Sequence, residues 1–276
     1  MTMRQIFQIN VHEVLRSKAP KLYPKIPDFL INAFTKLIYL DKVNAFLHRN
    51  STFTGVDLME KFLEETNIQF RIKGEENIPG FDEKCIFCSN HPLGGLDGVT
   101  LSVILGQKYD KRIRYLVNDI LYFIQPLQNI FVPINKHGAQ GRNAARAINE
   151  AFASENQIIT FPAGLCSRKT KGKISDLEWK KMFISKAIEY KRNIVPIYFE
   201  AKNSNLFYTV ANIRKKLCMK INIEMLLLPR EMFIARNSIF TVYFGKPIPW
   251  QTFDASQTPQ QWANWLKQEV YCMVKC

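Results

Sequence analysis

A histidine and an aspartate six positions apart are the residues of this sequence best suited to chemistry. His91 and Asp97 flank the adjacent glycines Gly94 and Gly95, which allow the backbone to turn sharply. Such a turn brings the carboxylate back to the imidazole. A carboxylate that fixes the tautomer of a histidine and stabilises the imidazolium makes that histidine a positioned general base. The structural alternative is that Asp97 only caps the helix that follows it.

The segment around His91 lies between a predicted strand and a predicted helix. From residue 68 to the C-terminus, strand-like and helical patterns alternate, which is typical of an α/β fold. Open α/β sheets place their sites in loops at the carboxyl ends of strands, so we expect His91 at such an edge. The strands are predicted at 68–72, 84–89, 113–117, 130–134, 157–161, 194–199 and 238–244, and the helices at 96–105, 141–152, 177–190, 205–228 and 258–274.

The first 66 residues follow a different pattern, because apolar residues recur at helical spacing over 28–47 and again over 54–66. The fold prediction is therefore an α/β domain over 67–276, with a central mixed sheet flanked by helices, preceded by a helical subdomain over 1–66. Lysines such as Lys25 and Lys36 accompany the apolar residues, so we expect this subdomain to face a membrane surface.

The net positive charge of the chain predicts an anionic partner. The chain holds 38 Lys plus Arg against 24 Asp plus Glu, a net charge of +14, yet 47% of its residues are hydrophobic, which excludes a disordered polycation. Nucleic acid, an anionic membrane surface or an acidic carrier could each account for the excess. We find no nucleic-acid-binding motif, although a basic nucleic-acid or lipid-binding protein without catalysis stays an alternative.

Part of this charge is clustered after residue 167. Nine Lys or Arg residues and three acids lie between Arg168 and Arg192. The cluster predicts a landing site for an anionic bilayer or an acidic carrier protein, and a solvated face is the alternative. The sequence contains no window of about 18 apolar residues and no signal-peptide pattern. We therefore expect a cytoplasmic protein whose cysteines are thiols.

Two cysteines have the C-x-x-C spacing of redox and zinc sites, Cys85 and Cys88. They fall in a predicted strand, where residues three apart point to opposite faces, so we do not expect them to act together. Cys166 is a candidate nucleophile.

Four blocks follow one another at predicted strand ends. They are Asn90-His91-Pro92-Leu93-Gly94-Gly95-Leu96-Asp97, Phe161-Pro162-Ala163-Gly164-Leu165-Cys166-Ser167-Arg168, Ile194-Val195-Pro196-Ile197-Tyr198 and Phe244-Gly245-Lys246-Pro247-Ile248. In this order they resemble the motifs of the glycerolipid acyltransferases, the 1-acylglycerol-3-phosphate acyltransferases and their relatives. The resemblance spans roughly residues 80–250.

Three departures from the family pattern concern the acceptor lipid. The spacing between His91 and Asp97 is one residue longer than usual, Ala163 replaces a glutamate, and Asn135 or Lys136 stands where the family has an arginine that holds phosphate. Arginine grips phosphate with a bidentate fork and lysine only as a point charge. The resemblance thus favours the branch that O-acylates N-acylated amino acids to make ornithine or glycine lipids, with lysophosphatidic acid as the alternative acceptor.

The resemblance implies direct acyl transfer from an acyl carrier protein or coenzyme A thioester to a lipid hydroxyl, with no metal or other cofactor. His91 would be the general base and Asp97 its orienting partner, and Cys166 would form no covalent intermediate. Backbone N–H groups of the Gly94–Gly95 turn or of residues 161–165 would stabilise the oxyanion. The protein would be peripheral on the inner face of the cytoplasmic membrane. Donor or acceptor binding is assigned to Asn90, Asn135, Lys136, Phe161, Pro162, Ala163, Gly164, Ser167 and Arg168.

Overall fold

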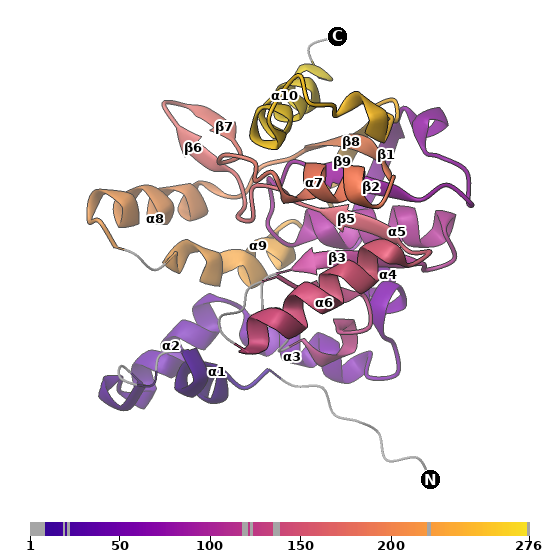
Figure 1. The fold of residues 1–276 in the computed structure, drawn as a ribbon. Coiled ribbons are helices and arrows are strands. Elements are labelled where there is room, and N and C mark those ends of the chain that lie inside the picture. Colours follow the sequence, from indigo (N-terminus) through magenta and orange to yellow (C-terminus); the bar gives the residue numbers. More distant parts are fainter. Residues whose placement is uncertain are drawn as a thin grey trace.

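A seven-stranded sheet forms the centre of the molecule (Figure 1). The structure, a computed structural model, describes residues 9–18, 20, 23–117, 121, 124–134, 139–219 and 222–274. The strand order is β1-β9-β8-β2-β5-β3-β4. Strands β8 and β9 pair antiparallel and the other neighbours pair parallel, so the predicted mixed sheet is confirmed. The strands are β1 Gln69–Lys73, β2 Cys85–Ser89, β3 Ile113–Val117, β4 Phe131–Pro133, β5 Gln157–Thr160, β8 Asn193–Glu200 and β9 Ile239–Phe244.

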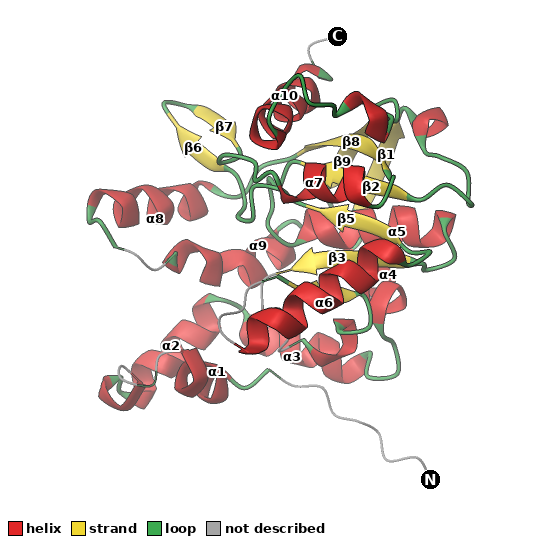
Figure 2. Cartoon of the chain, in the orientation of Figure 1, coloured by secondary structure: helices red, strands yellow, loops and turns green. Residues whose placement is uncertain are grey.

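Helices cover both faces of this sheet (Figure 2). One hydrophobic cluster joins the sheet to α4 and α5, and a second joins it to α6, α7 and α10. Cys85 belongs to the first cluster and Cys88 to the second, so the two thiols lie on opposite faces as predicted. The helices are α1 Val11–Lys18, α2 Asp28–Leu37, α3 Leu40–Arg49, α4 Gly55–Thr66, α5 Leu96–Lys108, α6 Ala139–Ala153, α7 Met182–Glu189, α8 Asn205–Lys216, α9 Leu228–Ile234 and α10 Pro259–Cys272.

The central strands carry the apolar sequences that a sheet covered on both faces requires. Every residue of β2 and of β5 is buried, as expected for parallel strands between two helical layers. These strands are parallel neighbours, and their carboxyl ends therefore lie at the same edge of the sheet. The loops that follow them carry the first two sequence blocks.

The structure differs from the predicted elements at four places. The helix predicted over 205–228 ends at Lys216 in α8, and a separate helix, α9, begins at Leu228. The helical pattern over 28–47 is divided into α2 and α3, because Tyr39 adopts a left-handed backbone conformation with φ 59°. The helix predicted over 177–190 begins only at Met182. Between β5 and α7 lies an unpredicted antiparallel hairpin of β6 (Arg168–Thr170) and β7 (Lys173–Ser175). Its two turn residues, Lys171 and Gly172, both have positive φ, the requirement of a type I′ turn.

The N-terminal segment is helical as predicted, and two of its helices contribute to the central core. Phe46 of α3 and Phe62 of α4 belong to the same hydrophobic cluster as Phe87 of β2. A boundary at residue 66 remains a prediction. Within the described part of the chain, no helix reaches the length and apolarity needed to cross a membrane.

Arg192 is not part of a basic surface, although it was counted in the basic cluster 168–192. Its side chain is fully buried and donates to the carbonyls of Phe152, Ser154 and Asn156. Burial lowers the pKa of its guanidinium to about 10. Arg192 thus ties the end of α6 to the start of β8 and belongs to the interior, while Lys171, Lys173, Lys180 and Lys181 of the same run are exposed.

The contact between α4 and α5 gives a test of the core. A Cβ at Gly106 would lie 2.6 Å from Cγ1 of Val56, closer than side chains tolerate. We expect Gly106→Ala to lower the free energy of unfolding by about 1–3 kcal/mol. In a Val56→Ala background the same change should be neutral or stabilising by up to about 1 kcal/mol, because alanine favours helix over glycine. Denaturant unfolding of the four variants measures both effects, and equal losses in the two backgrounds would contradict this contact.

Candidate active site

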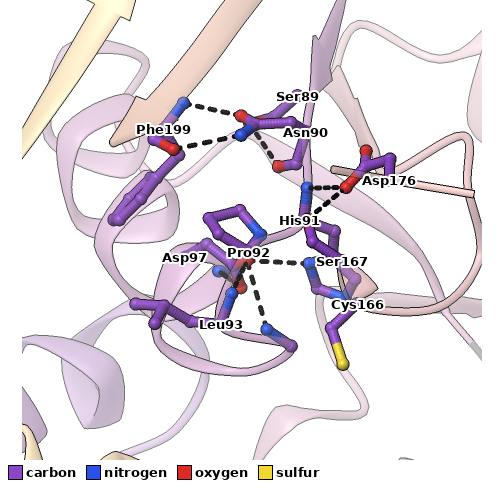
Figure 3. Close-up of polar contacts among 12 residues, drawn as sticks. Ser89, Asn90, His91, Pro92, Leu93, Asp97, Cys166, Ser167, Asp176 and Phe199 are labelled. Atoms are coloured by element: carbon purple, nitrogen blue, oxygen red, sulfur yellow. Dashed lines mark hydrogen bonds and ion pairs between the residues drawn. The ribbon is translucent and has the colours of Figure 1, made fainter. Parts of the chain in front are cut away.

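His91 and Phe161 follow two neighbouring parallel strands, β2 and β5, at the shared carboxyl edge. The first turn of α5 brings Asp97 to the same place (Figure 3). His91 has a side chain that is 13% exposed, whereas Asp97 has no exposed surface. The imidazole is therefore within reach of a substrate and its partner is shielded from water.

Four groups hold the Asp97 carboxylate. Its Oδ2 lies 2.9 Å from Nδ1 of His91 and accepts the backbone N–H groups of Leu93 (3.0 Å) and Gly94 (3.2 Å). Its Oδ1 accepts the N–H of Gly98 at 2.9 Å. The predicted pairing of His91 with Asp97 is present, and so is the structural role, because the carboxylate also binds the turn and the first turn of the helix. With Asp97 ionised, Nδ1 of His91 carries the proton and Nε2 is left as the basic atom.

Gly94 has a geometric reason to be glycine. Its φ is 74°, and a Cβ there would lie 2.8 Å from Cδ1 of Leu228 and 3.0 Å from Cβ of Cys166. The turn therefore touches both α9 and the loop after β5. A side chain at this position would push the turn away from these neighbours and move the N–H groups that bind Asp97.

An aromatic ring packs against the face of the imidazole. The rings of Phe161 and His91 stack with centroids 4.0 Å apart and planes 20° from parallel. Tyr115 stacks on Phe161 in turn, at 6.1 Å and 22°, and its hydroxyl donates to the carbonyl of Gly98 at 2.9 Å. Asp97 and Phe161 together restrict rotation of the imidazole.

The backbone of His91 is also held at both of its polar groups. Its N–H donates to Oδ1 of Asp176 at 3.1 Å, and its carbonyl accepts the N–H of Ser167 at 2.7 Å (Figure 3). Oγ of Ser167 donates to the same Oδ1 at 2.6 Å. Ser167 is among the predicted binding residues, whereas Asp176 and Tyr115 are not. Asp176 lies 85 residues after His91, among lysines that indicate a surface.

Several residues predicted to bind substrate have structural partners. Asn90 is buried, and its side chain accepts the N–H of Phe199 at 2.6 Å and donates to the Phe199 carbonyl at 3.0 Å. It thus bridges β2 to β8 beyond their ladder. Pro162 and Ala163 are buried, and Ala163 belongs to the second core cluster. A binding role for these three residues remains a prediction.

Gly164 is exposed at a positive φ of 68°, and its N–H donates to the Phe161 carbonyl. The N–H of Gly94 is directed at Asp97. These two N–H groups are therefore used within their loops. The expectation that backbone N–H groups of the Gly94–Gly95 turn or of residues 161–165 stabilise an oxyanion remains a prediction. Asn135 and Lys136 lie outside the described residues.

Arg168 is not a free cation. One of its nitrogens lies 2.8 Å from Oε1 of Glu224, which is fully buried, and Nε of Arg214 lies 2.9 Å from Oε2 of the same carboxylate. Two arginines around one buried carboxylate leave a net positive charge. Arg168 and Arg214 therefore fix β6 and α8 against the segment that precedes α9.

Cys166 is unsuited to nucleophilic chemistry. It has no exposed surface, and burial raises the pKa of its thiol to about 12. The thiolate, which is the nucleophilic form, is thus scarce at neutral pH. The interpretation of Cys166 as a packed interior residue agrees with its contacts to Gly94 and Met225.

Comparison with known proteins adds to this geometry. A family model described as Acyltransferase matches residues 13–276. The chain belongs to this family. This acyltransferase is 48% identical over 271 residues to the lyso-glycine lipid O-acyltransferase of Bacteroides thetaiotaomicron, with 98% of this chain and 99% of the relative covered. It is equally identical to a protein of the same name from Phocaeicola vulgatus, with 98% and 97% covered. The resemblance stated from the sequence blocks is confirmed.

A solved structure also resembles the acyltransferase. The crystal structure of the 1-acyl-sn-glycerophosphate acyltransferase PlsC from Thermotoga maritima matches with a TM-score of 0.47 and 16% sequence identity, over 90% of this chain and 93% of that one.

The buried thiol leads to a direct test. We expect Cys166→Ala to keep acyl transfer within about threefold of wild type, because a buried thiol of raised pKa serves packing and not catalysis. Steady-state rates measure this, and mass spectrometry of the wild-type enzyme with acyl donor alone should show no acylated protein. A thioester adduct on Cys166 together with an inactive variant would contradict this assignment.

Proposed function

We propose that this enzyme is an O-acyltransferase for lyso-aminolipids. It transfers a fatty acyl group from a carrier thioester to the hydroxyl on the fatty chain of an N-acylated amino acid, with glycine as the favoured head group. The observation that carries the proposal is a hydrogen-bonded His91–Asp97 pair in a chain that matches two lyso-glycine lipid O-acyltransferases along 98% of its length.

The chemistry follows from the free nitrogen of His91. Nε2 removes the proton of the acceptor hydroxyl as its oxygen bonds to the thioester carbonyl carbon. The tetrahedral intermediate then breaks its C–S bond, and the proton on Nε2 passes to the leaving sulfur. The products are an ester and a free carrier thiol, and the scheme requires no metal. Asp97 stabilises the imidazolium that exists between the two proton transfers.

The acyl donor is an acyl carrier protein or coenzyme A thioester. Both carry anionic groups, and the hairpin β6–β7 next to His91 presents the exposed lysines Lys171 and Lys173. A basic surface raises the local concentration of an anionic partner. This charge supports the donor class without distinguishing between its two members.

Exposed apolar side chains support a peripheral membrane location at the inner face of the cytoplasmic membrane. Helix α2 exposes Phe29 (68%), Leu30 (48%) and Leu37 (49%), and the C-terminal end of α8 exposes Ile213 (51%) and Leu217 (66%). The two helices share a third hydrophobic cluster and extend toward the same side (Figure 1). Lys36 of α2 and Lys215 of α8 are exposed beside them, and apolar residues flanked by lysines are typical of an interfacial surface.

Removal of the base tests the mechanism. We expect His91→Gln to lower kcat by about 10²–10⁴-fold, the usual contribution of a general base. Asp97→Asn should lower it within the same range, because an amide cannot hold the required tautomer and stabilise the imidazolium. The matched control is His48→Gln, since His48 is exposed on α3; its kcat should equal that of the wild type. Circular dichroism confirms folding, and a folded His91→Gln variant with wild-type kcat would end the proposal.

An acceptor panel tests the substrate class. The purified enzyme is incubated with acyl carrier protein or coenzyme A thioesters and with N-(β-hydroxyacyl)glycine, its ornithine analogue or lysophosphatidic acid. We expect the highest kcat/KM with the glycine acceptor. Transfer to lysophosphatidic acid alone would replace the proposed acceptor with a glycerophosphate, and transfer to none of the three would contradict the function as a whole.

A further inference from the structure

The two residues that flank the hairpin β6–β7, Ser167 and Asp176, are both hydrogen-bonded to the backbone of His91. The first and last strand residues of the hairpin, Arg168 and Ser175, are paired, so Ser167 and Asp176 lie opposite one another just beyond the ladder. Oγ of Ser167 donates to Oδ1 of Asp176 at 2.6 Å. This side-chain bond closes the base of the hairpin, and Asp176 lies outside the sequence blocks that indicated the family.

The base of the hairpin holds the main chain of His91 at two points. Oδ1 of Asp176 accepts the N–H of His91, and Ser167 donates its own N–H to the His91 carbonyl. These bonds fix the peptide groups on both sides of the His91 Cα. The position from which the imidazole extends is therefore set by residues that touch neither ring nitrogen.

Asp176 is itself held from several elements. Its Oδ2 accepts Nε1–H of Trp179 at 2.9 Å, its N–H donates to the Tyr271 hydroxyl at 2.7 Å, and its carbonyl accepts Nζ of Lys267 at 2.8 Å. Tyr271 and Lys267 both belong to α10. Asp176 is 5% exposed, and buried carboxylates persist when every oxygen is hydrogen-bonded. The carboxylate has one oxygen for His91 and Ser167 and another for Trp179.

We propose that Asp176 is a positioning residue for His91, which links α10 and the base of the hairpin to the backbone of the general base. The inference rests on the proposed function, because it assumes that His91 is the base. Asp176 is hydrogen-bonded to the backbone N–H of His91 and not to its ring, so it acts on the location of the imidazole. A displacement of about 1 Å in a reacting group can cost about 10²-fold in rate.

The substitution Asp176→Asn separates positioning from folding. An asparagine has only one accepting oxygen. If that oxygen accepts from His91 and Ser167, the NH₂ group faces the N–H of Trp179, and two donors oppose one another. If the oxygen accepts from Trp179, the bonds to His91 and Ser167 are lost. We expect kcat to fall by about 10- to 100-fold, with KM for both substrates within about twofold, because ground-state binding is unaffected.

A second substitution should rescue the first. Trp179→Phe removes the donor that opposes the asparagine NH₂, so the amide oxygen can return to the His91 N–H. We expect the double variant Asp176→Asn with Trp179→Phe to regain at least about fivefold in kcat over Asp176→Asn, and Trp179→Phe alone to stay within about threefold of wild type. These estimates follow from restoring one buried hydrogen bond.

The matched control is Gln157, the first residue of β5, which lies beside the start of β2. Gln157 is buried, accepts the N–H of Cys85 at 2.8 Å and donates to the carbonyl of Glu83 at 2.7 Å. Gln157→Ala therefore removes two hydrogen bonds that join β5 to the start of β2 and to the residue Glu83 before it, and neither bond involves His91. It should lower Tm as Asp176→Asn does, while its kcat stays within about twofold of wild type, as expected for a loss of stability alone.

A spectroscopic measurement makes the result independent of turnover. The proton on Nδ1 of His91, hydrogen-bonded to Asp97, should give a downfield ¹H resonance that is absent in His91→Gln. We expect Asp176→Asn to shift or broaden it, and Gln157→Ala to leave it in place. An unshifted resonance, a folded Asp176→Asn variant with kcat within twofold of wild type, or an equal kcat loss in Gln157→Ala would overturn the proposal. If the wild type acylates no acceptor, the proposed function fails, and the resonance still decides whether Asp176 positions His91.

Discussion

A carboxylate with no exposed surface accepts four hydrogen bonds where β2 passes into α5. An unpartnered charge in this position would cost several kcal/mol. Three backbone N–H groups and the imidazole of His91 offset that cost, and the amino end of a helix adds a favourable dipole. The same carboxylate thus shapes the turn and aligns the imidazole of His91, so the loop cannot change its path without releasing His91.

The remaining constraints on His91 come from one continuous stretch of chain after β5. Phe161 stacks on the ring, Ser167 binds the carbonyl and Asp176 binds the N–H. Cys166 adds a contact with the Gly94 turn. The segment from Phe161 to Asp176 leaves the sheet at the end of β5 and passes beside His91, which follows β2. Because β5 and β2 are parallel neighbours, the loops after them lie at the same edge of the sheet. The unpredicted hairpin β6–β7 completes this loop and brings its two ends together.

The sheet and the pairing of His91 with Asp97 could be predicted from the sequence because both depend on local patterns. Apolar runs such as 84–89 require burial on both faces, and His91 and Asp97 are close enough in the chain for a glycine turn to join them. Contacts over long sequence separations could not be predicted in this way. Asp176 lies in a stretch of lysines that indicates a surface, and Arg192 resembles its charged neighbours until the carbonyls of the α6 end are seen around it. The break at Tyr39 was missed because apolar spacing continues across it.

Part of the positive charge behind the net +14 is used inside the protein. Arg192 lies in the interior, and Arg168 and Arg214 surround the buried Glu224, since a guanidinium offers several donors in a fixed geometry. Lysines such as Lys171 and Lys173 stay at the surface, where a strongly hydrated ammonium is favoured. These two lysines occupy the tip of the hairpin whose base holds the backbone of His91. The exposed lysines at the tip and the hydrogen bonds to the backbone of His91 at the base therefore belong to one short structural unit.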